Sequence, residues 1–281
     1  MVHKKFTAAR FSIYLFLIIV ALFSLFPIAY TLSSSFKSND ELLLTGATLI
    51  PANPSMQNYI DAWKNANFSV YIFNSLYITV FATIGSIIVT TLGGYSFSRG
   101  TYAGKKLIFS LFTGTMFLSL GTINLFPLLQ ITRAMHITGL TGVILIRVLG
   151  LNVASLFLVR GYVNTLPKEL DEAAYMDGCS PYQIYLRIIL PISKPIIATV
   201  GLLAVRATWN DWLLPRVFTL GEKSKYPLTV GILTLKDTGA AASSWNLMVA
   251  GAIISILPII ILYLMFNKYF IAGLTSGSVK G

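Results

Sequence analysis

Six polar or charged residues stand inside long apolar stretches of this sequence. They are Asn124, Arg147, Arg206, Trp209, Asn210 and Asp211. Such side chains are costly in an apolar environment and usually face the interior of a helix bundle or a water-filled cavity. Trp209 and Asn210 follow Arg206 by three and four residues, so on a helix the three side chains share one face. We expect the six residues to line a pathway for a hydrophilic solute, with contacts between helices as the alternative.

The apolar stretches of this sequence lack the residue types that catalysis requires. No histidine, cysteine or glutamate falls within an apolar stretch, so a nucleophilic triad, a metal site and a paired-carboxylate mechanism are all incomplete. Cys179 is the one cysteine, which excludes a disulfide framework and a thiolate-rich metal site. The phosphate-binding pattern GxxxxGK[ST] does not occur either. We therefore expect no catalytic residue, no metal and no cofactor on this chain.

The composition is that of a membrane protein. Only 11% of the 281 residues are charged, 55% are hydrophobic, and the mean hydropathy is +0.74, whereas soluble domains carry about 25% charged residues. A transmembrane helix needs about 20 mostly apolar residues. We predict an all-α polytopic membrane protein with six transmembrane helices in a single domain. The helices are expected at residues 11–32, 70–97, 107–132, 137–159, 188–214 and 245–267.

The basic residues predict the orientation of the chain. A net charge of +11 fits lysines and arginines retained in cytoplasmic loops better than nucleic-acid binding. The short loop 99–106 is the clearest case, because its basic residues flank the ends of two spans. We therefore expect both termini, the loop 160–187 and the tail 268–281 to lie in the cytoplasm.

The loop 160–187 and the start of the next span predict a helix, a turn and a second helix. Gly178 fits the left-handed position after the first helix, and Ser180-Pro181 supplies the cap and first-turn proline of the second. The first helix has a narrow apolar stripe that needs a cover. Lipid headgroups are one alternative, but acidic side chains favour a protein partner over an anionic membrane surface. These acids are Glu169, Asp171, Glu172 and Asp177.

The same segment resembles the EAA loop of ABC importer permeases. The matching residues are Glu172, Ala173, Ala174, Asp177, Gly178, Leu190 and Pro191. The resemblance covers most of the chain: Trp-Asn-Asp at 209–211 and the tail 273–281 are similar to carbohydrate permeases of the maltose-importer type. It implies that the matching residues form a coupling helix that docks on an ATPase subunit.

The resemblance also implies partners and a cargo. The chain is expected to be a permease subunit of a bacterial ABC importer in the plasma (inner) membrane, beside a second, homologous permease subunit. Two ATP-binding cassette subunits would bind ATP and Mg. An extracellular solute-binding protein would deliver a carbohydrate, docking on the outer loop 223–245. Amino acids or peptides are an alternative cargo, and an ion-coupled secondary transporter is a further alternative. Membrane lipid is an expected partner; nucleic acid is not.

The charge of the cargo follows from two arginines. Arg147 and Arg206 both lie near the middle of their expected spans, where Asp211 is the one acid. One cation is therefore left to face water, an acid of a partner subunit or an anionic ligand. A guanidinium matches a carboxylate in geometry, and Trp209 could stack on a sugar ring. This favours an acidic saccharide; the alternative is a neutral oligosaccharide with both arginines paired across helices.

Overall fold

A computed structural model describes residues 8–44, 47–65, 67–118, 121–150, 152–235 and 244–276. Every regular element among these residues is helical. The chain forms two compact units: residues 1–68 with 232–256, and residues 69–231 with 257–281. The last residues of the expected cytoplasmic tail, 277–281, and part of the expected outer loop, 236–243, lie outside the described residues.

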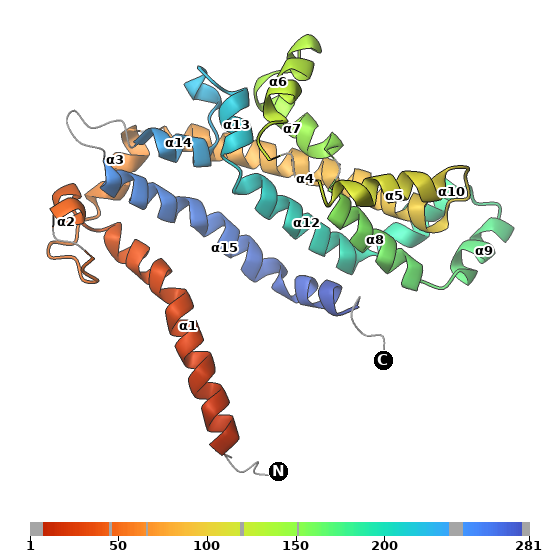
Figure 1. Ribbon diagram of the computed structural model, residues 1–281, viewed down its shortest axis with the longest axis horizontal. Helices are drawn as coiled ribbons and strands as arrows, with labels where there is room; N and C mark the ends of the chain where they lie inside the picture. Colours follow the sequence, from red (N-terminus) through yellow and green to blue (C-terminus); the bar gives the residue numbers. More distant parts are fainter. Residues whose placement is uncertain are drawn as a thin grey trace. The chain divides into compact units, whose positions relative to one another are not determined.

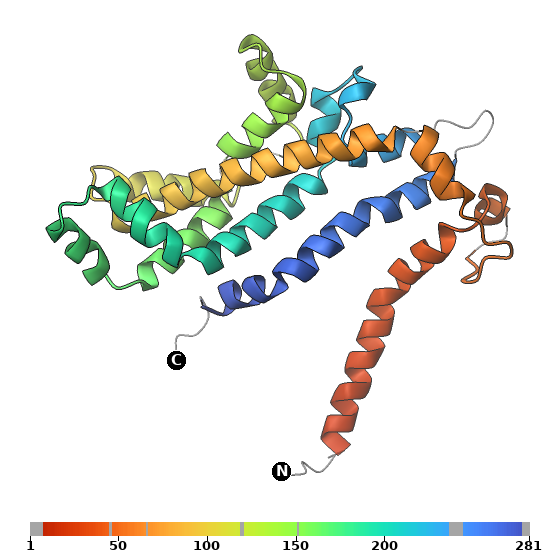
Figure 2. The same ribbon diagram turned by 180° about the vertical axis from the view of Figure 1, so that it is seen from behind.

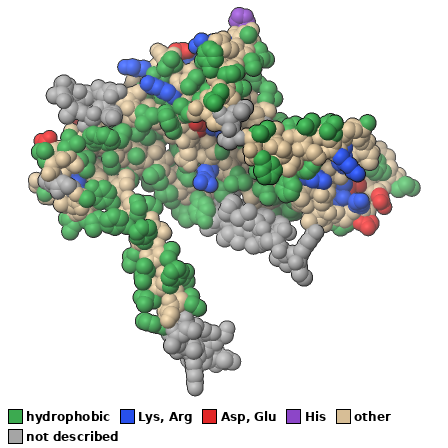
Figure 3. Space-filling model, viewed as in Figure 1, with side chains coloured by type: hydrophobic (Ala, Val, Ile, Leu, Met, Phe, Trp, Pro, Cys, Tyr) green, Lys and Arg blue, Asp and Glu red, His purple; other side chains and the backbone are tan. Residues whose placement is uncertain are grey.

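The first unit contains α1 (Ala8–Ser34), α2 (Asn39–Leu44), α3 (Gln57–Asn65) and the beginning of α15 (Trp245–Ser276). Hydrophobic side chains cover the surface of α1 (Figure 3), as expected for a helix in lipid. After α1 the chain turns around Lys37, whose buried ammonium donates to Thr48 Oγ1 at 2.8 Å. The side-chain amide of Asn58 on α3 holds the same turn through the carbonyls of Ser35 and Lys37.

The second unit carries the segments singled out by the sequence. Its long helices α4 and α12 run side by side, and α9 lies near one end of the unit (Figures 1 and 2). Its elements are α4 (Phe68–Arg99), α5 (Lys105–Thr115), α6 (Leu125–Ala134), α7 (Gly139–Leu149), α8 (Val153–Thr165), α9 (Glu169–Met176), α10 (Pro181–Ile184), a π-helical turn (Tyr185–Ile189), α11 (Leu190–Ile192), α12 (Lys194–Trp209), α13 (Leu213–Phe218), a 3-10 turn (Lys223–Lys225) and α14 (Leu228–Leu235), which crosses the boundary between the units.

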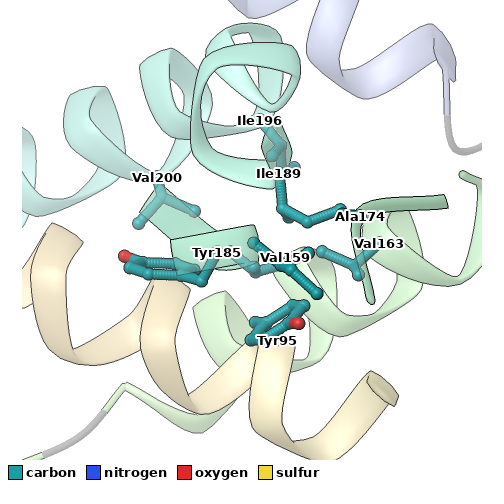
Figure 4. Packing of buried hydrophobic residues seen from close by; sticks show 9 residues of the cluster. Tyr95, Val159, Val163, Ala174, Tyr185, Ile189, Ile196 and Val200 are labelled. Atoms are coloured by element: carbon teal, nitrogen blue, oxygen red, sulfur yellow. The ribbon is translucent and has the colours of Figure 1, made fainter. Parts of the chain in front are cut away.

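Glycines on α4 allow α8 to approach it closely. A Cβ atom added to Gly94 would lie 2.5 Å from Val159, and one added to Gly93 would lie 2.7 Å from Leu156. Membrane helices commonly pack through small residues. Lipid is as apolar as the helix surfaces, so the hydrophobic effect does not drive the helices together and close van der Waals packing must do so. Nine buried residues from α4, α8, α9, α10, the π-helical turn and α12 then form one cluster, eight of which are labelled in Figure 4. This cluster joins the segment that contains α9 and α10 to the long helices α4 and α12.

The prediction of an all-α polytopic membrane protein is confirmed. Within the described residues, three helices are long and apolar enough to cross a bilayer: Phe11–Ser34, Phe68–Arg99 and Trp245–Met265. Two bent pairs also qualify if each is one span: α6 with α7, bent by 114°, and residues 181–192 with α12, bent by 83°. The described chain therefore has three to five candidate spans by length and composition, where the sequence predicts six.

The helix boundaries differ from those expected. Residues 107–132 are two helices, α5 and α6, separated by a turn in which Gly121 adopts φ +55°. Residues 137–159 are also two helices, because α7 ends before Gly150 and Asn152 begins α8 by accepting a hydrogen bond from the Ser155 N–H at 3.1 Å. The fifth expected span, 188–214, ends as a helix at Trp209, and α15 continues past the sixth to Ser276. An uncharged stretch predicts which residues are buried in the membrane, but it does not predict where a helix begins or ends. Caps and turns within the stretch set those boundaries.

Candidate coupling loop and transport pathway

The EAA segment forms a short helical hairpin, α9 followed by α10. Gly178 ends α9 with φ +80°, in the left-handed region. The N–H groups of Gly178 and Cys179 donate to the carbonyls of Tyr175 and Ala174 at 3.0 and 2.9 Å, so the last turn of α9 is closed by backbone bonds. Glycine adopts this conformation without steric cost. The sequence prediction of a left-handed turn at Gly178 is confirmed.

The second half of the hairpin begins with a capping box. The Ser180 side chain accepts from the Gln183 N–H, and the Gln183 side chain accepts from the Ser180 N–H at 2.7 Å. Pro181 occupies the first turn, where its missing N–H costs no bond. The predicted restart at Ser180-Pro181 is therefore confirmed, and the reciprocal bond of Gln183 strengthens it.

The predicted coupling residues fall into two groups. Ala174 is buried and Leu190 is half-buried, both against the cluster of Figure 4. The other group is exposed and consists of Glu172, Ala173, Asp177, Gly178 and Pro191. Acidic side chains appear at this end of the unit in Figure 3. The exposed group can contact a partner, whereas the buried residues attach the hairpin to the rest of the unit.

An ion pair that the sequence analysis missed ties α9 to α4. Arg99, the last residue of α4, places Nε 3.0 Å from the Asp171 carboxylate of α9, and about a tenth of each side chain is exposed. A second nitrogen, Nη2, donates to the Leu166 carbonyl at 2.7 Å. Arg99 therefore fixes both the start of the loop and the helix that the loop presents. In the sequence, Arg99 at the end of an expected span indicated only the orientation of the chain across the membrane. No sequence pattern paired Arg99 with Asp171.

A cavity of about 600 Å³ lies among α4, α6, α7, α8, α12 and α13. Its polar lining includes Ser86, Thr90, Asn124, Arg147, Asn152 and Ser155. Two of the predicted pathway residues, Asn124 and Arg147, thus meet at one cavity. Asn124 is exposed and its side chain makes no cap bond at the start of α6. Hydroxyl and amide groups of this kind suit hydrogen bonding to a hydroxyl-rich solute.

Asp211 forms an ion pair with Arg147 across two helical segments. The Arg147 guanidinium of α7 contacts one carboxylate oxygen of Asp211. The other oxygen accepts from the Leu213 N–H at 3.1 Å and the Leu214 N–H at 3.4 Å, so Asp211 also caps α13. The charge that lines the cavity at Arg147 is therefore already compensated within the chain.

Arg206, Trp209 and Asn210 keep their helical spacing at the end of α12, but their surroundings differ. Helix α12 ends at Trp209, and Asn210 is its cap, with the Asn210 N–H donating to the Arg206 carbonyl at 3.2 Å. Trp209 is only 3% exposed, whereas Arg206 and Asn210 are exposed. None of the three belongs to the cavity lining. Trp209 therefore offers almost no ring surface to a solute in this structure, and its expected stacking on a sugar stays a prediction.

We expect Asn124→Leu to lower the rate of sugar uptake about threefold to tenfold, because one neutral hydrogen bond to a solute contributes about 0.5–1.5 kcal/mol. Uptake at saturating binding protein measures this effect, and ATPase activity without sugar should stay unchanged. The matched control is Gln130→Leu, on the same helix but outside the cavity lining. Equal uptake by the two variants would contradict a pathway role for Asn124.

The bundle of apolar helices with its exposed hairpin is the architecture of a polytopic membrane protein. Residues 103–275 match the family described as "binding-protein-dependent transport system inner membrane component". The match covers more than half of the chain, and the chain belongs to this family. It is a transport subunit of an ABC transporter rather than an enzyme.

Relatives align with almost the whole chain. The arabinooligosaccharides transport system permease protein AraQ of Bacillus subtilis (strain 168) is 33% identical, over 99% of this chain and 98% of the relative. The probable ABC transporter permease protein YurM of the same organism is 30% identical, over 99% and 91%. A chain of the crystal structure of a bacterial ABC transporter involved in the import of the acidic polysaccharide alginate superposes with a TM-score of 0.80. That chain is 26% identical, with 96% of this chain and 100% of that one covered.

Proposed function

We propose that this chain is a permease subunit of a bacterial importer that carries an oligosaccharide into the cytoplasm. The cavity with hydroxyl and amide groups around it is the observation that carries the cargo class. The substrates named for its relatives support this cargo class, since they include arabinooligosaccharides, galactooligosaccharides and alginate. Amino acids and peptides would require charged partners for the backbone ammonium and carboxylate of the solute. The Arg147–Asp211 pair satisfies its own charges instead.

The proposed assembly contains a second permease subunit, two ATP-binding cassette subunits and an extracellular solute-binding protein. ATP and Mg are bound by the cassette subunits, and both termini of this chain lie in the cytoplasm. The exposed α9 surface, with Glu172 and Asp177, docks on a cassette subunit. Arg99 and the cluster of Figure 4 then pass the movement of α9 to α4 and α12. Alternating access exposes a site between the helices to each side of the membrane in turn.

Uptake into proteoliposomes tests the cargo class. The assembled importer with its binding protein is supplied with ATP inside the vesicles and with labelled oligosaccharides, amino acids or short peptides outside. We expect ATP-dependent accumulation of an oligosaccharide and none of the amino acids or peptides. Accumulation of an amino acid or a peptide in place of any saccharide would overturn the proposal.

A further inference from the structure

Two basic side chains converge on the end of α4, which is the candidate membrane span Phe68–Arg99. Lys105 donates from Nζ to the carbonyls of Ser98 and Gly100 at 3.2 and 2.7 Å. Arg160 of α8 donates from Nε to the Phe97 carbonyl at 3.3 Å. Both cations therefore lie at the carbonyl end of one helix, which attracts positive charge. Among the hydrogen bonds of the described residues, Arg160 uses Nε alone, so its two Nη groups can donate to a further acceptor.

A third cation, Lys168, lies just before α9 and adds to this positive charge. Within the described residues, none of Lys105, Arg160 and Lys168 forms an ion pair with a carboxylate. The buried acid of α9, Asp171, is engaged by Arg99. Burial, and then the charges of Arg160 and Lys168, lower the pKa of Lys105 below its ordinary value. The three charges thus repel one another and together favour a negatively charged ligand. Basic side chains are visible at this end of the unit in Figure 3.

An exposed apolar surface continues from these cations along α5 and α8. Leu107 and Leu111 are exposed and lie four residues apart on α5, so they share one face of that helix. Phe157 of α8 is also exposed, and its ring stacks on Phe109 of α5 with the ring centroids 6.4 Å apart. The Arg160 guanidinium lies over the same Phe109 ring, 3.9 Å from its centroid. Phe109 therefore joins the positive charge to the apolar surface.

We propose that Lys105, Arg160 and Lys168 bind the phosphate of an anionic phospholipid, whose acyl chains lie along the exposed apolar side chains of α5 and α8. Positive charge at the end of a span, next to apolar surface, fits a ligand with a phosphate at one end and hydrocarbon at the other. A free phosphate would leave the apolar surface uncovered, and the ammonium group of a zwitterionic lipid would be repelled by the same cations. The inference goes beyond the proposed cargo and does not depend on it. The bound lipid holds the end of α4, the start of α5 and the approach to α9 at the membrane surface.

Native mass spectrometry of the assembled importer tests this site. The importer is freed of lipid in detergent and titrated with phosphatidylglycerol, or with phosphatidylcholine that has the same acyl chains. We expect the wild type to bind at least one phosphatidylglycerol more tightly than any phosphatidylcholine. The double variant Lys105→Gln, Arg160→Gln should bind that lipid at least about tenfold more weakly, because each basic residue contributes about fivefold to binding at an anionic lipid surface. The exchange Lys105→Arg, Arg160→Lys keeps both charges and should retain most of the binding.

The double variant Lys64→Gln, Arg133→Gln is the matched control, since it removes the same two charges from exposed positions in the last turns of α3 and α6. It should bind phosphatidylglycerol as the wild type does. Equal binding of the two lipids by the wild type would overturn the proposal without any variant. Displacement of the lipid by inorganic phosphate would also overturn it and assign the cations to a soluble anion. Unchanged lipid binding in Lys105→Gln, Arg160→Gln, together with loss of the ATPase subunits on purification, would assign them to a protein contact instead.

Discussion

Replacing Gly178 by valine is expected to lower sugar uptake at least about tenfold while the permease still inserts and assembles. Gly178 has φ +80°, and a Cβ atom added there would meet nothing within 4 Å. The effect of valine is therefore confined to the backbone, where a left-handed residue costs about 1–2 kcal/mol and a β-branched side chain costs more. That strain opens the turn closed by the Cys179–Ala174 bond and displaces the exposed acids of α9. We expect uptake to fall at least about tenfold, because a shift of 1.4 kcal/mol changes a docking equilibrium by that factor.

Asparagine at the same position is the control for this prediction. It tolerates the left-handed region better than other residues with a Cβ atom, so Gly178→Asn should keep most of the uptake. Both variants are measured for uptake and for sugar-stimulated ATPase activity in the assembled importer. Normal coupling in Gly178→Val would show that the turn geometry at residue 178 has no role in docking.

Turn chemistry was predictable from sequence because it depends on neighbouring residues alone. Gly178 and Ser180-Pro181 have conformational preferences that act within one turn, and the structure places each as expected. Long uncharged stretches similarly predicted the apolar helices Phe11–Ser34 and Phe68–Arg99. In both cases the physical cause, a backbone preference or transfer into lipid, is local to the segment.

Helix breaks and long-range pairs were not predictable in this way. The break after α7 lies in an uncharged stretch, and hydropathy is unchanged whether such a stretch is one helix or two. Helical spacing related Arg206 to Trp209 and Asn210, but it could not show that Trp209 is buried while the other two are exposed, because burial depends on the neighbouring helices. Arg99 and Asp171 meet because α4 and α9 pack against a common cluster, and several basic residues were equally available to Asp171 in the sequence.

Removing the negative charge of Asp171 should release the α9 hairpin from α4. The Asp171→Asn variant leaves the Arg99 guanidinium nine-tenths buried without its counter-ion, and breaking one side of a buried ion pair costs about 3–5 kcal/mol. We expect uptake and sugar-stimulated ATPase activity to fall together, because the hairpin no longer transmits movement to α4. Glu169→Gln, which changes an exposed acid at the start of the same helix, should have little effect.

The single cysteine reports on this release directly. Cys179 is half-buried beside the turn and donates its N–H to Ala174, so its reaction with a maleimide should accelerate in Asp171→Asn and not in Glu169→Gln. The double variant Arg99→Met, Asp171→Leu provides the decisive comparison. Replacing both charges by apolar side chains leaves no uncompensated ion. The labelling rate of Cys179 in the double variant should therefore lie closer to the wild-type rate than the labelling rate in Asp171→Asn does. If the double variant instead reacts faster than Asp171→Asn, or if Asp171→Asn reacts at the wild-type rate, the ion pair does not hold the hairpin. Such a result would leave the apolar cluster of Figure 4 as the attachment of α9.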